Sequence, residues 1–191
     1  MSDEYEFDAV DRITFGAIGP PGRRTFYLQA RAGLESVTLL VEKDHVIALS
    51  EGTEEIFKAA GYPRESIEWD ADSMALEEPL EPAFRVGTSA IGYAEDRDLV
   101  LIECRPPVER DAGGEPDPDL EPDPDLEPDP DLGIGSGPSA RFWITRAQLE
   151  ALSAYGMIVA AQGRPVCPLC RVPMDPEGHQ CFASNGHRTA G

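Results

Sequence analysis

Four residues near the C-terminus have the types and the spacing of a zinc site. Cys167 and Cys170 form a C-P-x-C pair, and after a stretch rich in turn residues the chain returns with His179 and Cys181. A C-x-x-C turn aims two thiolates at one point and leaves backbone amides free to hydrogen-bond the sulfurs. Three thiolates and one imidazole complete the tetrahedral coordination of a structural zinc ion. The sequence therefore predicts a structural Zn²⁺ held by these four side chains.

The fourth ligand depends on the choice between two histidines. An ordinary zinc ribbon has a second C-x-x-C, but Ser184 stands three positions after Cys181. His179 lies only two residues before Cys181, so coordination by both requires a local bend in an extended chain. His187 is the alternative donor, and a tail without stable metal is the third possibility. We take His179 as the ligand, and the three cysteines belong to either zinc version.

The same cysteines could serve two other kinds of chemistry. A thioredoxin-like pair needs a helix that begins at the motif, because the helix dipole lowers the pKa of the thiol. Pro168 and the Arg-Val-Pro-Met-Asp-Pro run after the motif argue against that helix. A Cys–His nucleophile needs an orienting group and an oxyanion site, and neither is identifiable. Cys104 stands alone in an apolar run and is expected to pack in the core.

The charge of the chain is concentrated in one segment. The 191 residues include 36 acidic and 16 basic ones, for a net charge of −20, which excludes a generally basic nucleic-acid binder. Residues 115–132 repeat EPDPDL three times and hold nine of the carboxylates. Because leucine is the only apolar residue of the repeat and six prolines interrupt it, we expect a disordered acidic insertion over residues 109–138. The tail, residues 164–191, has a net charge of only +1, so nucleic acid is an unlikely partner.

The elements that must carry the tail are predicted mainly as strands. Apolar and polar residues alternate along several short runs, and two of these flank the turn residues Gly19-Pro-Pro-Gly22. The run that follows the acidic repeats could pair with the run before them, which would make the repeats an overgrown hairpin loop. The expected strands are residues 13–18, 25–30, 35–42, 83–93, 99–105 and 140–144.

Two helices are expected. Thr145 and Gln148 form a capping-box pattern ahead of apolar residues at helical spacing, and a glycine at position 163 ends the run. The other helix would be capped by Ser50 or Thr53 and end near residue 60, with residues 45–49 as a fourth strand or as the lead into the helix. An α+β fold follows: a mostly antiparallel sheet of five to seven strands with two helices on one face.

The expected organisation has four parts. Residues 1–108 and 139–163 form the α+β body, the acidic insertion interrupts it, and residues 164–191 form a small zinc-knuckle-like tail. The acidic N-terminus has no apolar signal segment, and no run of apolar residues is long enough to span a membrane. We therefore expect a cytoplasmic protein. No catalytic motif such as G-x-S-x-G or H-E-x-x-H occurs, which favours a role other than catalysis.

The motifs together carry a family resemblance. Three groups of residues carry it: residues 22–30, residues 84–88 with 91–93, and residues 163–170 with 175–181 and 185–186. The chain resembles an actinobacterial family known as domain of unknown function 3090. The family has no assigned activity, so the resemblance implies a bacterial cytoplasmic protein and no reaction. Relatives carry Tyr in place of His187, which favours His179 as the ligand, and they have a shorter acidic loop.

A binding role is the preferred functional interpretation. The sequence favours a zinc-stabilised binding or adaptor module, whose partner is a protein or a small anionic ligand. The alternative is an enzyme or sensor that acts on a phosphorylated or nucleotide-like small molecule through Arg24 and Arg85, with Gln29 nearby in the same strand motifs. Guanidinium groups offer a planar fork of donors to phosphate or carboxylate. The simpler interpretation, which the acidity of the chain favours, is that both arginines pair with surrounding acids.

Overall fold

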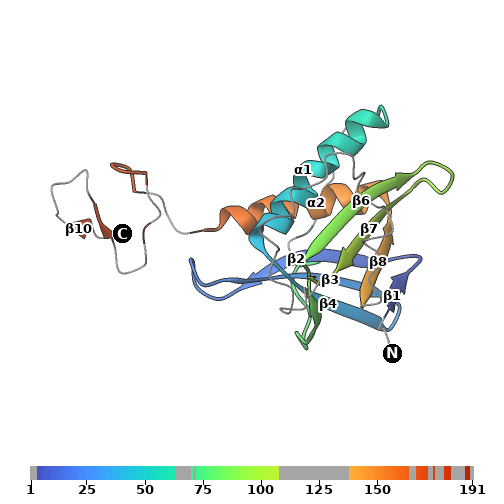
Figure 1. The fold of residues 1–191 in the computed structure, drawn as a ribbon, viewed down its shortest axis with the longest axis horizontal. Helices are drawn as coiled ribbons and strands as arrows, with labels where there is room; N and C mark the ends of the chain where they lie inside the picture. The colour runs from blue at the N-terminus through green and yellow to red at the C-terminus, as the bar shows by residue number, and fades with distance from the viewer. Residues whose placement is uncertain are drawn as a thin grey trace, which may run out of the picture.

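The chain forms an α+β fold, as the sequence predicted. The computed structural model describes residues 4–62, 70, 72–107, 138–163, 167–171, 174, 179–181 and 188–189. In this part of the chain two helices accompany two four-stranded sheets and one two-stranded hairpin (Figure 1). Neither helix is long and apolar enough to cross a lipid bilayer. Apart from its last residue, the predicted acidic insertion lies outside the described residues.

The first sheet contains the strands that bracket the acidic insertion. Its order is β1 (Glu4–Phe7), β8 (Ser139–Ile144), β7 (Leu99–Arg105) and β6 (Thr88–Ala94). β7 pairs antiparallel with both neighbours, so the predicted pairing across the insertion is confirmed. β1 lies parallel to β8. The sequence did not predict β1, because its four residues include two glutamates and only a short alternation.

The second sheet contains the predicted N-terminal hairpin. Its order is β2 (Arg12–Ile18), β3 (Thr25–Ala32), β4 (Glu35–Val41) and β5 (Pro82–Arg85). The first three strands pair antiparallel, and β5 joins parallel to β4. The strands of the two sheets run in clearly different directions (Figure 1). The expectation of one sheet of five to seven strands is therefore corrected to two sheets.

The predicted strand over residues 83–93 is divided between these sheets. The Val86 amide donates to the Leu40 carbonyl at 2.8 Å, in the second sheet, whereas the next amide, that of Gly87, donates to the Arg105 carbonyl at 2.8 Å, in the first. A Cβ at Gly87 would lie 2.4 Å from the Pro107 backbone, so this crossing point requires glycine. The alternation of polar and apolar residues did not reveal the break, because β5 and β6 both have the two-residue period of a strand.

The two helices are α1 (Lys43–Ala59) and α2 (Arg146–Ala161). The capping box of α2 is confirmed, since the Gln148 amide donates to the Thr145 hydroxyl and the Thr145 amide donates to the Gln148 side chain. The predicted start of α1 was wrong. Ser50 and Thr53 lie inside the helix, where their hydroxyls donate to carbonyls four residues earlier. The helix begins instead after Glu42, whose amide donates to His45 Nδ1 at 3.2 Å.

In the part of the chain that the structure describes, one large core lies between the helices and both sheets. The helices lie side by side (Figure 1), and the Ser153 hydroxyl of α2 donates to the Ser50 carbonyl of α1 at 3.0 Å. Alternate residues of every long strand point into this core. The largest fully buried side chains are Phe15, Phe142, Leu28, Leu39, Ile102, Ile144, Leu149 and Leu152.

Candidate metal centre

The C-x-x-C pair sits on a tight turn that the backbone stabilises. Residues 168–170 form the turn, and the Arg171 amide donates to the Cys167 carbonyl at 2.8 Å. Arg171 has a φ of 58°, a left-handed conformation that few residues other than glycine adopt. Proline at position 168 suits this turn because its fixed φ favours the second position of a turn. The sequence thus forms the knuckle that its spacing predicted.

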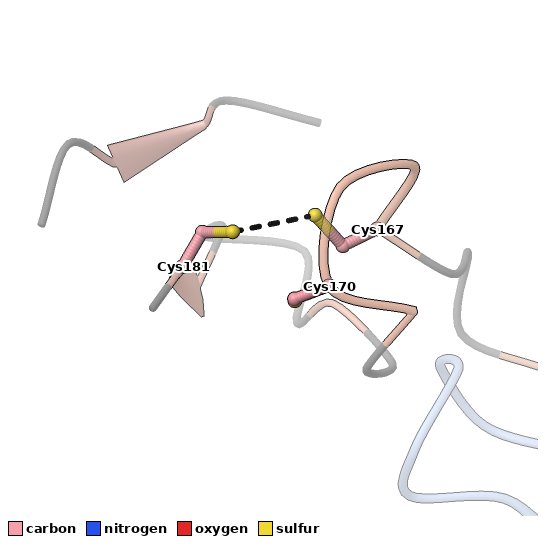
Figure 2. A group of neighbouring side chains, drawn as sticks. All are labelled: Cys167, Cys170 and Cys181. Atoms are coloured by element: carbon pink, nitrogen blue, oxygen red, sulfur yellow. Dashed lines mark hydrogen bonds between the residues drawn. The ribbon is translucent and has the colours of Figure 1, made fainter. Parts of the chain in front are cut away.

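The turn and a later segment bring three thiols together. The Sγ atoms of Cys167, Cys170 and Cys181 all lie within 4.8 Å of one another. Figure 2 shows the sulfurs of Cys167 and Cys181 facing each other, with Cys170 beside them. The Cys167 and Cys181 sulfurs are 3.8 Å apart. Two sulfurs bound to one tetrahedral zinc ion at about 2.3 Å each would be separated by about 3.8 Å. The spacing of the described thiols therefore fits a shared metal ion.

Backbone amides favour the thiolate form of Cys167. The Cys170 amide, and after it the Leu169 amide, hydrogen-bond the Cys167 sulfur and lower the pKa of this thiol to about 7. Burial acts in the opposite direction, because a buried thiolate loses hydration. Metal ions bind thiolates rather than thiols. The amides of the knuckle thus prepare this sulfur for coordination.

A small apolar contact closes one side of the thiol cluster. Met174 is buried against Cys167 and Cys181, apart from the main core. Sequence analysis missed this residue, although it is the apolar residue of the Pro-Met-Asp-Pro stretch within the tail motif. Leu169, at the tip of the knuckle, is instead exposed to solvent over 56% of its surface. The described part of the tail therefore has its own apolar centre, and Leu169 protrudes from it.

The predicted fourth ligand lies on a short hairpin next to Cys181. His179 begins β9 (His179–Gln180), which pairs antiparallel with β10 (Arg188–Thr189). The strand ends immediately before Cys181. The side chain of His179 and the whole of His187 lie outside the described residues. Coordination by His179 stays a prediction.

The other chemistry considered for these cysteines has less structural support. No α-helix begins at the C-x-x-C motif within the described residues, although a thioredoxin-like site needs one. Cys104 lies in β7 and is fully buried, and this burial raises the pKa of its thiol to about 12. It is a core residue, as predicted, and belongs to a different hydrophobic cluster from the tail cysteines.

The three residues predicted for anion binding have different environments. Arg85 at the end of β5 pairs with Glu42, the residue before α1, as the ion-pair alternative predicted. Arg24 lies half-buried immediately before β3. Gln29, in the middle of β3, is buried. A ligand site made by these residues stays a prediction.

Gln29 holds a connecting segment against the second sheet. Its side-chain oxygen accepts the Glu77 amide at 2.8 Å, and its nitrogen donates to the Glu77 carbonyl at 2.8 Å and to the Thr38 hydroxyl at 3.0 Å. Arg12 on β2 donates to the carbonyls of Ser73 and Ala75 in the same segment. Sequence analysis missed Arg12, because its partners are 61 and 63 positions away.

These features define a class of protein: an α+β body followed by a C-terminal tail with three clustered cysteines. The chain belongs to the family described as Protein of unknown function (DUF3090), which matches residues 5–181. The match includes both four-stranded sheets almost entirely and ends at Cys181, so all three thiols fall inside it. The predicted resemblance is thereby confirmed. No curated protein and no solved structure matched the chain.

Proposed function

We propose that the tail binds one structural Zn²⁺ ion and that the metal-bound knuckle is a recognition surface for a protein partner. The observation that carries the proposal is the convergence of three thiols within 4.8 Å of one another. Zinc would be held by Cys167, Cys170 and Cys181, with His179 as the fourth ligand. Four protein ligands leave no open position for a water or substrate, which is typical of structural sites.

The recognition role rests on the exposure of one side chain. Leu169 protrudes from the knuckle, while its own amide hydrogen-bonds the Cys167 sulfur. Its backbone is therefore fixed by the same turn that holds the thiols. An apolar side chain on a rigid turn is a suitable anchor for an apolar pocket of a partner, because little conformational freedom is lost on binding.

Metal analysis of the purified full-length chain tests the first part of the proposal, the binding of zinc. We expect about one zinc per chain, and a strong loss in Cys167→Ser, Cys170→Ser and Cys181→Ser. Cys104→Ala is the matched control, because this cysteine lies in the core of the body and should not affect the zinc content. A content below about a tenth of an equivalent under non-chelating conditions would overturn the proposal.

Two further substitutions separate the fourth ligand from its alternative. His179→Ala should weaken zinc affinity about tenfold or more, whereas His187→Ala should leave the affinity unchanged. The reverse result would assign His187 as the fourth ligand.

A substitution at the knuckle tip tests the recognition role. Leu169→Asp should abolish the capture of partners that the wild-type protein retains, at unchanged zinc content. If both proteins capture the same partners, the knuckle tip is not the recognition surface.

A further inference from the structure

The three clustered thiols differ in their exposure to solvent. Cys167 and Cys181 are fully buried, whereas Cys170 is partly exposed. Met174 is the principal described residue that covers the cluster, and it belongs to the tail rather than to the main core. Cys104 differs from all three, because it is fully buried inside the main core. Of the four cysteines, Cys170 is therefore the one that a small reagent in solution reaches first.

A second sulfur lies within reach of Cys170 on the same turn. The Sγ atoms of the three tail cysteines lie within 4.8 Å of one another, so a small side-chain movement brings two of them into bonding distance. A disulfide also needs about 4.4–6.8 Å between the two Cα atoms. Cys167 and Cys170 are three positions apart on one turn, and Cα atoms so placed lie within about 7 Å. An accessible thiol beside a second thiol is typical of redox-sensitive sites.

The partner of Cys170 follows from the way the tail is held together. Cys167 shares its turn, which the Arg171 amide closes by donating to the Cys167 carbonyl at 2.8 Å. Cys181 instead follows the two-residue strand β9 and meets the turn through the thiol cluster and a small apolar contact. Once a shared metal ion leaves, the turn still keeps Cys167 beside Cys170 at high effective concentration, whereas the segment of Cys181 is released.

We propose that the tail is a redox switch, in which hydrogen peroxide oxidises Cys170 and Cys167 to a disulfide and the metal ion is released. This inference rests on the proposed zinc site. In the first step the Cys170 thiolate attacks a peroxide oxygen: an S–O bond forms, the O–O bond breaks, and hydroxide leaves a sulfenic acid behind. The Cys167 thiolate then attacks this sulfur, so that an S–S bond forms, the S–O bond breaks and a second hydroxide leaves. The two sulfurs lose two electrons to the peroxide, and two protons from solvent convert both hydroxides to water.

The disulfide removes two of the four zinc ligands. Cys181 and His179 alone are left, whereas a structural zinc site uses four ligands. The Leu169 amide, which hydrogen-bonds the Cys167 sulfur in the reduced tail, then meets a neutral sulfur that accepts only weakly. The knuckle tip therefore changes together with the metal site. Because the thiol cluster is separate from the main core, the body should stay folded in the oxidised protein.

Zinc release from the full-length, zinc-loaded protein tests the switch. We expect an excess of hydrogen peroxide to release about one zinc per chain, measured with a chromogenic chelator, and a dithiol reductant with added zinc to restore binding. Peptide mass spectrometry of the oxidised sample should find a disulfide between Cys167 and Cys170, with Cys181 and Cys104 still as thiols. Peroxide is smaller than the usual alkylating reagents, so it reaches the partly exposed sulfur even in the metal-loaded tail.

Two histidine substitutions form a matched pair. Cys170→His and Cys181→His each leave two thiolates and two imidazoles, a ligand set that structural zinc sites also use. Cys170→His removes the accessible thiol, whereas Cys181→His retains both cysteines of the turn. Peroxide should therefore release zinc from Cys170→His at least about tenfold more slowly than from Cys181→His.

The outcomes separate this inference from the proposed function. An untreated wild-type protein without zinc overturns the proposed function, and this inference with it. A zinc-loaded wild type that keeps its metal in peroxide, or whose disulfide includes Cys181, overturns the switch alone. Equal peroxide sensitivity of the two histidine variants does the same. If either variant fails to bind zinc, the disulfide mapped in the wild type decides.

Discussion

The sulfurs of Cys167 and Cys181 lie 3.8 Å apart, although the two residues are 14 positions apart in the sequence. One belongs to the knuckle turn and the other follows strand β9, so their proximity requires two separate segments to fold together. Few buried apolar residues assist, since Met174 is the principal one described in this cluster. A bound metal ion would supply the missing stabilisation, as it does in other small metal-dependent modules.

Removing the metal should therefore loosen the tail without unfolding the body. After treatment with a strong chelator, we expect faster amide hydrogen exchange in residues 167–171 and 179–181. The amides of β7 and β8 should keep their protection, because the main core contains none of the tail cysteines. Mass-spectrometric exchange with and without chelator measures both regions in one sample. Equal exchange of the tail in the two conditions would show that no metal stabilises it.

Thiol alkylation should distinguish two classes of cysteine. In the folded, metal-loaded protein none of the four should react quickly, and chelation should make the three tail cysteines reactive. Cys104 should stay unreactive until the body unfolds, because its thiol is buried and its pKa is raised to about 12. Intact-mass analysis counts the labels, and a denatured sample should carry four. Early labelling of Cys104 would contradict its place in the core.

The sequence predicted those features that depend on local pattern. The knuckle follows from the spacing of Cys167 and Cys170, and the start of α2 from the capping box at Thr145, so both could be located without the structure. The pairing of β7 with β8 was also predicted, because matching alternation on the two sides of the acidic repeats left few other partners.

Features that depend on distant contacts could not be predicted. The switch between sheets at Val86 and Gly87 depends on two acceptors, the carbonyls of Leu40 and Arg105, that no local pattern identifies. The start of α1 was missed because Val46 and Leu49 fit a strand as well as a helix until the buried positions further along are known. Gln29 resembled a ligand-binding residue because its partner, Glu77, lies 48 positions away.

Gln29→Ala should destabilise the body. The substitution leaves the buried Thr38 hydroxyl and the part-buried Glu77 amide and carbonyl without their partner. A buried unsatisfied group costs about 1–3 kcal/mol, and a part-buried one costs less because water reaches it. Arg85→Ala is the control, since its ion pair with Glu42 is largely exposed and should contribute less than about 1 kcal/mol. Denaturant unfolding measures the free energy of unfolding of both variants. Equal stability of the two variants would contradict the structural role of Gln29.

The contact between the helices and β2 should tolerate no side chain at position 156. A Cβ at Gly156 would lie 2.7 Å from the Phe15 ring and 3.2 Å from Val46, so Gly156→Ala should cost about 1–3 kcal/mol. Alanine is otherwise the better helix former by about 1 kcal/mol. Gly52→Ala in α1, where the nearest atom is 3.4 Å away, should therefore be neutral or stabilising. Thermal unfolding of the pair checks the prediction, and a stabilised Gly156→Ala would refute the close packing.

The carboxylate of Asp98 should stabilise the body at neutral pH and lose this effect at acidic pH. The Tyr93 hydroxyl donates to its carboxylate at 2.6 Å, and Arg146 at the start of α2 donates at 3.1 Å. Both interactions, with the Tyr93 hydrogen bond first, lower the pKa of Asp98 in the folded state.

A carboxylate whose pKa is lower in the folded state stabilises the protein above its unfolded pKa of about 3.9, and this contribution is lost as the pH falls through the folded pKa. Asp98→Asn is a suitable variant, because asparagine tolerates the positive φ of 50° at this position and can still accept the Tyr93 hydrogen bond. The variant should be less stable than the wild type at neutral pH. Below about pH 4 the difference in unfolding free energy should shrink. A difference that stays constant from neutral to acidic pH would show that the charge of Asp98 does not stabilise the fold.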